Sequence, residues 1–360
     1  MNNRMTAYLD GKGVLSANDS SLTHGMAGLY CHGNAGTYFD DFVVESLEGV
    51  VGNAWSDTDG DGVDNDLDKC PETPEGVPVD QRGCHVQEKV VIEQGNFQLE
   101  SGRITLTHEW KQVSFTNPFT YPLVVAKPLS YNGTDPATVE IAEVTPEGFR
   151  VRIHEWSYTE ASHIEETLSY LAVERGHFVP GNGLEIEADI ITTNVTGAGR
   201  EKSAAVAQRV HFFSGFPGNP IVFAARASIN GEDTVATRID RVTPGGLSVL
   251  MQEQESNEQS HVYETISYIA INPGPAEIGG ETLYTGRAKV THEPSTITLP
   301  TGDKIEVHVD EEQSSNEETD HNEESVGYLF FSSNPHLFLA DIQTIWCSDT
   351  ANLRYEVVPE

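Results

Sequence analysis

Residues 57–70 read DTDGDGVDNDLDKC and place six aspartates within twelve positions. An EF-type calcium loop needs oxygen ligands at positions 1, 3, 5, 7 and 12, with glycine at position 6. Counting from residue 57 puts acids at positions 1, 3, 5 and 12, Gly62 at position 6, and a backbone carbonyl at position 7. The spacing predicts a Ca²⁺ site formed by Asp57, Asp59, Asp61, Val63, Asp64, Asp66 and Asp68. A solvated acidic linker is the alternative interpretation.

The chain has four cysteines, and two of them, Cys70 and Cys84, enclose a short loop rich in Pro and Gly. We predict that these two form a disulfide. Closing so short a loop would stabilise the segment by about 3 kcal/mol, mainly by restricting the unfolded chain. A structural disulfide implies an oxidising compartment.

Two resemblances concern the first 90 residues. The stretch 57–84, with its aspartate spacing and its Cys-Pro…Gly-Cys end, resembles a thrombospondin type 3 repeat, which implies that the aspartates bind calcium. The pattern GLY…N…FDDFVV before it resembles the C-terminal end of laminin-G-like or concanavalin-like jelly rolls of polysaccharide-degrading enzymes. We therefore expect residues 1–50 to be the last strands of an incomplete jelly roll and residues 51–90 to be a calcium-binding connector. The chain would then be part of a longer, secreted bacterial protein.

Charge and hydropathy exclude several kinds of partner. The chain of 360 residues has 21 Lys and Arg against 56 Asp and Glu, a formal net charge of −35. So acidic a protein is unsuited to nucleic acid or to an anionic membrane surface. No stretch reaches the roughly 18 apolar residues needed to span a bilayer, so membrane insertion is not expected. A location outside the cell or on its surface is predicted.

Alternating apolar and polar residues, interrupted by Gly, Pro, Asn and Asp, run through the rest of the chain. GFRVRIHEW, PIVFAARASI and HLFLADIQTIW are examples. This period of two is typical of antiparallel strands with one buried face. The predicted fold class is all-β, with antiparallel β-sandwiches in tandem.

A duplication is visible beyond residue 90. VTPEGFRVRIHEW…SHIEETLSYLAV recurs 98 residues later as VTPGGLSVLMQEQ…SHVYETISYIAI. A third copy begins at TGRAKVTHEP and predicts domains at 91–178, 179–275 and 276–360, the last lacking its final strands. In an alternative alignment, His321, Glu324 and Tyr328 occupy the His/Glu/Tyr positions of the earlier copies.

The copies resemble H-type lectin domains, the sandwiches of snail agglutinins and discoidins, through SGRITL, VSFTNPFTYPLVV and VTPEGFRVRIHEW…LSYLAVE. The resemblance implies binding of galactose-type sugars, and trimers, either of separate chains or of repeats within one chain. The sugar-binding candidates carried over by position are His154, Glu155, Trp156 and His163, with Glu253 and His261 in the second copy. Alternatives are a buried ladder, a turn-capping role for the histidines, or a weak metal site.

Nothing in the sequence marks catalysis. Glu165 and Glu166 are adjacent on a predicted strand and so point to opposite faces, whereas a glycosidase needs two facing acids. Tandem copies favour binding, because linked weak sites gain avidity. We expect a non-catalytic polysaccharide- or glycan-binding protein with Ca²⁺ as its cofactor. The alternatives are a surface adhesion protein with a protein partner, and a polysaccharide lyase or hydrolase.

Overall fold

The computed structural model describes residues 4–9, 12–18, 57–59, 63, 65, 68, 71, 73, 89–159, 162–197, 207–315, 321–344 and 350–358. The chain divides into two compact parts, Met1–Cys84 and His85–Glu360. In the first part, β1 (Arg4–Leu9) and β2 (Lys12–Asn18) form an antiparallel hairpin, as the sequence predicts. The rest of the expected jelly-roll end, and all four cysteines, lie outside the described residues.

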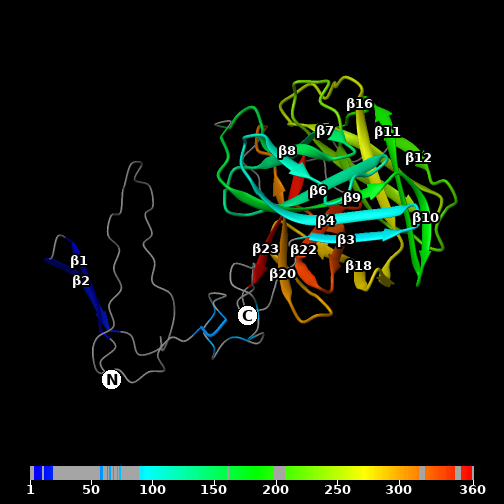
Figure 1. Cartoon of the computed structure of the whole chain (residues 1–360). Helices are drawn as coiled ribbons and strands as arrows, with labels where there is room; N and C mark the ends of the chain where they lie inside the picture. Colours follow the sequence, from blue (N-terminus) through cyan, green and yellow to red (C-terminus); the bar gives the residue numbers. More distant parts are fainter. Residues whose placement is uncertain are drawn as a thin grey trace. The chain divides into compact units, whose positions relative to one another are not determined.

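The second part, which we call the β-body, consists of three repeats (Figure 1). Repeat 1 contains β3 (Lys89–Gln94), β4 (Phe97–Leu106), β5 (Lys111–Ser114), β6 (Pro122–Ser130), β7 (Ala137–Thr145), β8 (Gly148–Glu155) and β9 (Glu166–Glu174). Repeat 2 contains β10 (Gly176–Gly181), β11 (Leu184–Thr193), β12 (Gln208–His211), β13 (Ile221–Arg226), β14 (Val235–Thr243), β15 (Gly246–Glu253) and β16 (Glu264–Ile271). Repeat 3 contains β17 (Gly274–Ile278), β18 (Glu281–Val290), β19 (Ser295–Thr298), β20 (Lys304–Glu311), β21 (Glu324–Phe331), β22 (Asn334–Ile342) and β23 (Ala351–Val358). The prediction of an all-β fold of antiparallel sandwiches is confirmed.

Each repeat has the same two layers. A four-stranded layer has the order β3-β4-β9-β6, β10-β11-β16-β13 or β17-β18-β21-β22, and a three-stranded layer has the order β5-β8-β7, β12-β15-β14 or β19-β20-β23. A short parallel pairing of β23 with β6 joins the layers of repeats 3 and 1 into one sheet. Tyr170, Tyr268 and Tyr328 therefore occupy one equivalent position, each opposite an alanine of the neighbouring strand.

Repeat 3 reaches this architecture by a different strand order. Its β20 and β21 occupy the places of β8 and β9, and only afterwards does the chain form β22 and β23, in the places of β6 and β7. The described residues of repeat 3 thus supply the same set of strands as the other repeats, so the expectation that it lacks its last strands does not agree with the structure. The alternative alignment, with His321, Glu324 and Tyr328 at the shared positions, is the one that the strand pairing supports.

The hairpin between the last two strands of the three-stranded layer explains why the VTPEG and VTPGG motifs end in glycine. A Cβ at Gly148 would lie 2.1 Å from the carbonyl oxygen of Val113, and one at Gly246 would lie 2.1 Å from that of Val210. Both oxygens belong to backbone of a neighbouring strand and cannot move aside without breaking the ladder. The glycine therefore lets β5 or β12 approach the hairpin closely enough to pair.

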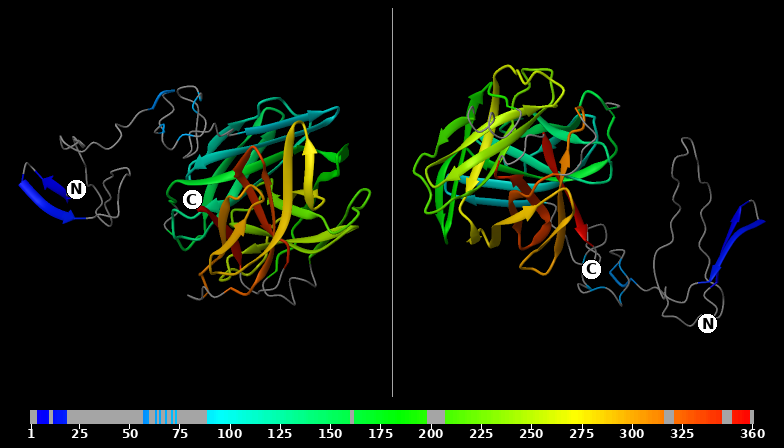
Figure 2. Two further views of the ribbon diagram at one scale, coloured as in Figure 1. Left: turned by 90° about the horizontal axis from the view of Figure 1, so that it is seen from below. Right: turned by 180° about the vertical axis from the view of Figure 1, so that it is seen from behind.

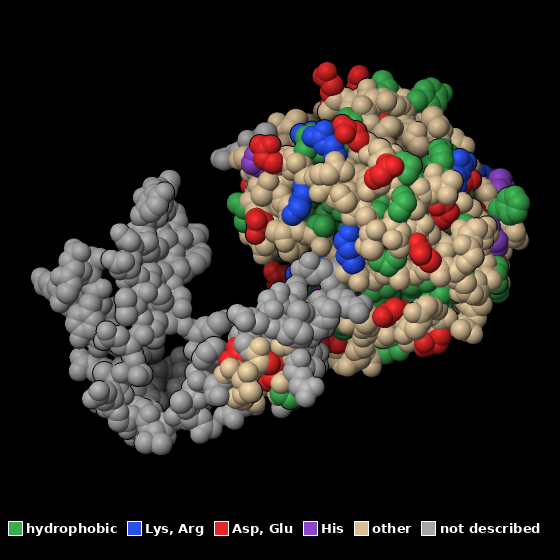
Figure 3. Space-filling view, in the orientation of Figure 1, with side chains coloured by type: hydrophobic (Ala, Val, Ile, Leu, Met, Phe, Trp, Pro, Cys, Tyr) green, Lys and Arg blue, Asp and Glu red, His purple; other side chains and the backbone are tan. Residues whose placement is uncertain are grey.

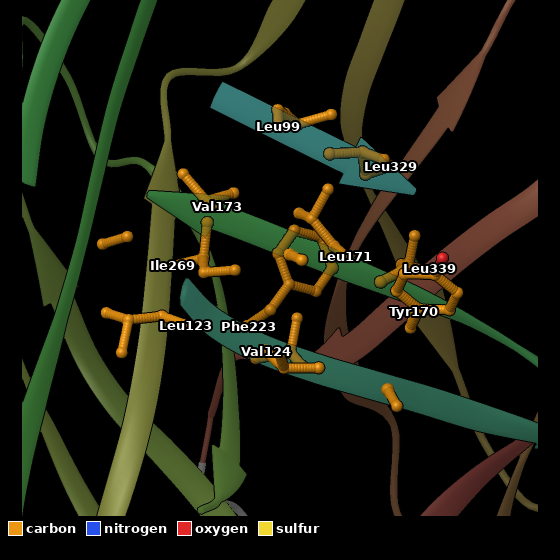
Figure 4. Close-up of a cluster of buried hydrophobic side chains, with 14 of the residues drawn as sticks. Leu99, Leu123, Val124, Tyr170, Leu171, Val173, Phe223, Ile269, Leu329 and Leu339 are labelled. Carbon is orange, nitrogen blue, oxygen red and sulfur yellow. The ribbon is translucent and has the colours of Figure 1, made fainter. Parts of the chain in front are cut away.

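The three repeats share one hydrophobic core. Figure 4 shows Leu99, Leu171 and Val124 of repeat 1 beside Phe223 and Ile269 of repeat 2 and Leu329 and Leu339 of repeat 3. All of these side chains are almost completely buried. Both views in Figure 2 show strands from the three repeats within one β-body. The repeats are consequently not independent domains, since none can expose its inner face without losing this burial.

A cavity of about 50 Å³ lies where β6, β13 and β22 meet. It is lined by residues of all three repeats, among them Lys127 of β6, Thr237 of β14 and Asp341 of β22. Lys127 Nζ lies 3.0 Å from Asp341 Oδ2 and donates to Thr237 Oγ1 at 3.2 Å. A partly buried ion pair therefore links repeats 1 and 3 at this cavity.

Candidate functional site

The structure brings together Glu155, His163 and Glu166 in a buried cluster of repeat 1. His163 Nδ1 lies 2.9 Å from Glu155 Oε1, and its Nε2 lies 3.3 Å from Glu166 Oε1. Glu166 also accepts hydrogen bonds from the hydroxyl of Ser130 and from the backbone N–H of Gly133. The two ring nitrogens of His163 thus link two carboxylates of the same repeat.

The cluster recurs at the equivalent positions of repeat 3 and in an altered form in repeat 2. His321 contacts Glu311 through Nδ1 and lies 3.2 Å from Glu324 Oε1 through Nε2. In repeat 2, His261 Nδ1 lies 3.9 Å from Glu264 Oε1, and its other nitrogen faces the carbonyl oxygen of Asp233. Each histidine is at most 8% exposed. The shared His/Glu positions of the sequence therefore form interior networks.

Arginines complete these networks from the neighbouring repeat. Arg354 of repeat 3 places NH1 3.9 Å from Glu166 Oε1 of repeat 1. Arg238 of repeat 2 places NH2 2.9 Å from Glu324 Oε1 of repeat 3. We call the contact regions between repeats the 1–2, 2–3 and 3–1 seams. Arg354 lies in the 3–1 seam and Arg238 lies in the 2–3 seam.

The 1–2 seam has the opposite polarity. Glu140 of β7 occupies the position that Arg238 and Arg354 hold on β14 and β23. The cation comes instead from Arg226 of β13, which contacts Glu140 and lies 3.8 Å from Glu264. At this seam a glutamate on β7 replaces the arginine, and Arg226 on β13 lies near both Glu140 and Glu264.

The seam charges shift the pKa values of their carboxyl groups. Burial raises the pKa of Glu140, but the hydrogen bond and charge of His154, with the charges of Arg226 and Arg152, outweigh it and lower that pKa to about 2. For Glu324, burial is likewise outweighed, chiefly by the hydrogen bond from His321 and the charge of Arg238, and its pKa is lowered. The carboxylates of Glu311 and Glu324 raise the pKa of His321 against the effect of its burial. The charges of the seams thus favour the ionised forms of Glu140 and Glu324 and the protonated form of His321.

Five of the six residues predicted to bind sugar lie inside the β-body. Trp156 is 1% exposed and so cannot stack on a sugar ring at the surface. The exposed fraction is 8% or less for the other four, Glu155, His163, Glu253 and His261. These side chains pack between strands and loops, because their strands face a neighbouring repeat and not solvent. Of the predicted set, only His154 is partly exposed, with 27% of its side chain accessible.

His154 belongs to a surface cluster that the sequence analysis did not identify. Arg150, Arg152 and His154 alternate with buried residues along β8 and so share its outer face. Trp110, just before the paired strand β5, lies beside them: its ring centroid is 5.0 Å from Arg150 Cζ and 4.6 Å from Arg152 Cζ. Glu140, opposite Arg152 on β7, completes what we call the Trp110 patch (Trp110, Glu140, Arg150, Arg152 and His154).

The polar contacts of the Trp110 patch fix its guanidinium groups. Arg152 donates from Nε and NH2 to Glu140 Oε2 at 2.8 and 2.7 Å. Arg150 donates from NH1 to Glu143 Oε1 at 3.0 Å, and the side chain of Glu143 is 65% exposed. In Figure 3, Lys and Arg side chains are scattered singly over the visible face, and one group with acidic neighbours lies in the region of β7 and β8. An aromatic ring, planar donors and carboxylates converge there.

Part of this cluster could have been found from the sequence. RVRIH carries Arg150, Arg152 and His154 at a spacing of two, which puts them on one face of a strand. Trp110 lies forty residues earlier in SGRITLTHEW, and only the pairing of β5 with β8 brings it alongside. The resemblance to lectins directed attention to the residues after β8 instead.

The predicted calcium loop is described only in part. Asp61, Asp64 and Asp66 lie outside the described residues, and the carboxylate of Asp59 accepts a hydrogen bond from the backbone N–H of Thr73 at 2.8 Å through Oδ2. The buried Oδ1 of Asp59 has no hydrogen-bond donor within the described residues. An acceptor of this kind, on an acid of the predicted ligand set, fits a cation as its partner. Across the part of the chain that the structure describes, no group of three or more His, Cys, Asp or Glu side chains is arranged to hold a metal ion.

Comparisons with known proteins give limited matches. Halomucin of Haloquadratum walsbyi is 23% identical over 267 residues, which is 63% of this chain but 3% of Halomucin. Outer membrane porin F of Pseudomonas aeruginosa is 37% identical over 86 residues, 24% of this chain and 23% of the porin. No family model and no solved structure matches the chain. The matches span a small fraction of both relatives, so neither gives this chain a family.

The described residues include no helix that is long and apolar enough to cross a membrane.

Proposed function

We propose that the β-body is a non-catalytic carbohydrate-binding module for a galactose-type glycan, in a protein that is secreted or exposed on the bacterial surface. The Trp110 patch carries this proposal. A partly exposed indole offers an apolar plane for a sugar face, while Arg150, Arg152 and His154 offer hydrogen-bonding groups for hydroxyls. The ring is held by two guanidinium groups, so little conformational freedom is lost on binding.

Two further observations support a binding role and a location outside the cytoplasm. Glu166, one of the paired acids considered for catalysis, is 0% exposed and accepts hydrogen bonds from Ser130, Asn132 and Gly133, so its role is structural. One relative is by name an outer membrane protein. The acidic composition suits a surface exposed to salt, which screens the repulsion among its charges.

Replacing Trp110 by alanine is expected to weaken glycan binding at least tenfold, about 1.4 kcal/mol. The measurement is retardation in gels that contain galactans, followed by titration with the best ligand. Tyr121→Ala is the matched control, because Tyr121 is also an exposed aromatic residue of repeat 1 (49%) with an arginine, Arg175, over its ring at 5.1 Å. Failure of every galactan to retard the unmodified protein would contradict the proposal. Release of reducing ends or unsaturated products would favour an enzyme instead.

For the connector, we propose that the Asp57–Asp68 loop binds Ca²⁺ and stiffens the segment 51–90. The support is the aspartate spacing and the buried, unpaired Oδ1 of Asp59. In the full chain, Ca²⁺ is expected to protect residues 51–90 from proteolysis, and Asp59→Asn to weaken this protection at least tenfold in Ca²⁺ concentration. Glu109→Gln, at an exposed acid of the β-body, is the control. Equal cleavage with Ca²⁺ and with a chelator would refute the site.

A further inference from the structure

The Trp110 patch occurs once in a β-body whose repeats are otherwise equivalent. The strand pairing aligns Val151 of β8 with Val249 of β15 and Val307 of β20. On either side of these valines, the positions of Arg150, Arg152 and His154 are held by the buried Ser248, Leu250 and Gln252 in repeat 2, and by Glu306, His308 and Asp310 in repeat 3. Neither of the other repeats has an arginine at these positions. The residues by which repeat 1 differs from the other two repeats are therefore concentrated on β8.

The same departure includes the reversed polarity of the 1–2 seam. At the 2–3 and 3–1 seams, an arginine occupies the position of Glu140, and a second cation at the position of Arg152 would face it across the ladder. With Glu140 in that place, Arg152 has a carboxylate partner at 2.7 Å and lies over Trp110. The Trp110 patch therefore depends on having a glutamate, and not an arginine, at position 140.

Arg226 of repeat 2 provides the charge that makes the reversal stable. It is 5% exposed and contacts Glu140, which is 2% exposed. The equivalent positions on β6 and β22 are Leu129 and Ile342, which carry no charge. The contacts run from Arg226 through Glu140 to Arg152 and to the ring of Trp110, so the patch is assembled across the boundary of two repeats.

Charge balance indicates the class of ligand. Three guanidinium groups, of Arg150, Arg152 and Arg226, face three carboxylates, of Glu140, Glu143 and Glu264. Glu143 is largely exposed, so its weak ion pair with Arg150 can be exchanged for one with a ligand. Arg150 uses only NH1 in that pair, which leaves its other N–H groups for a bidentate contact with a carboxylate or sulfate. A ligand anion that replaces Glu143 would therefore find a guanidinium group with free donors at the surface of a chain of net charge −35.

We propose that the ligand of the Trp110 patch is an acidic saccharide, bearing a carboxylate or sulfate that Arg150 and Arg152 bind while Trp110 stacks on the sugar ring. Arg226 is a positioning residue, which acts on Arg152 through Glu140. This inference rests on the proposed glycan-binding function. Because the whole chain repels anions at long range, moderate salt will not abolish binding as it does for a basic protein.

The test compares three galactose-type polymers in affinity gels at moderate salt: polygalacturonate, a sulfated galactan and a neutral galactan. The expected result is at least tenfold stronger retardation by the acidic polymers than by the neutral one. Equal retardation by the neutral galactan would overturn the acidic class and leave the proposed function intact. If no polymer retards the protein, the proposed function fails as well.

Two variants test the positioning role. The double variant Glu140→Arg, Arg226→Ile gives the 1–2 seam the residues of the 2–3 seam, where Arg238 pairs with Glu324 beside Ile342. We expect it to keep its thermal unfolding midpoint, because the new arginine can pair with Glu264, and to lose binding of polygalacturonate at least tenfold. Arg152→Leu, the residue of repeat 2, leaves the seam intact and should lose binding equally. Full binding by either folded variant would overturn the inference.

Discussion

Replacing Arg354 by alanine is expected to lower the free energy of unfolding of the β-body by about 3–5 kcal/mol, the usual cost of removing one partner of a buried ion pair. Arg354 is 0% exposed. It lies 2.9 Å from Asp310 and donates to the carbonyl oxygens of Ser130 and Asp135 at 3.1 and 2.7 Å. Alanine would leave the buried carbonyl oxygen of Ser130 without this donor and would remove a cation from Asp310 and Glu166. Urea unfolding at pH 7 measures the effect.

Arg175→Ala is the matched control for this prediction. Arg175 also pairs with an aspartate, Asp189, at 2.7 Å, but 41% of its side chain is exposed. An exposed ion pair contributes about 0–1 kcal/mol, because water solvates both charges when the pair is broken. Arg354→Lys should lie between the two, since lysine keeps the charge but cannot reach all the acceptors. An equal loss in Arg175→Ala and Arg354→Ala would show that the 3–1 seam does not hold the repeats together.

Acid is expected to destabilise the β-body by about 3 kcal/mol through Glu140 alone. The folded pKa of Glu140 is about 2, against 4.5 for the free side chain, so its contribution is complete above pH 4.5 and is lost as the pH falls toward 2. The lowered pKa values of Glu166 and Glu324 act in the same direction. Burial raises the pKa values of Asp310 and Asp341, which opposes this loss.

The contribution of Glu140 can be isolated by measuring urea unfolding between pH 7 and pH 3 in Glu140→Gln. This variant should be less stable than the unmodified protein at pH 7 and should lose less stability on acidification, because its amide does not titrate. Glu143→Gln serves as the control, since Glu143 pairs with Arg150 nearby but is 65% exposed. The explanation fails if Glu140→Gln and the unmodified protein have the same pH dependence.

At higher pH the direction is opposite: a group with a raised pKa loses its contribution to stability as the pH rises. The raised pKa of His321 means that its charged form stabilises the fold fully below about pH 6.5, and that this contribution is lost as the pH rises through the folded value. The 2–3 seam is consequently most stable at a pH where Glu324 is ionised and His321 is still protonated.

Local sequence determined the strands and their repetition. Alternation in GFRVRIHEW and PIVFAARASI predicted strands that the structure contains as β8 and β13, because a period of two follows directly from the geometry of a strand. The shared His163, Glu166 and Tyr170 marked equivalent positions correctly. Which faces meet water could not be predicted: both faces of β13 are buried, whereas one face of β8 keeps Arg150, Arg152 and His154 partly exposed.

Only the tertiary structure decided what the marked residues do. Trp156 and the clustered histidines suggest a sugar site on chemical grounds, yet packing of three repeats around one core buries them. The arginine partners of Glu166, Glu264 and Glu324 lie up to 188 residues away in the chain, so no local sequence pattern predicts these ion pairs. The permuted order of repeat 3 was equally hidden, because strand pairing depends on spatial neighbours and not on chain order. The Trp110 patch has the same origin: its residues come from β7, β8 and the start of β5, and repeat 2 supplies the charge that holds them.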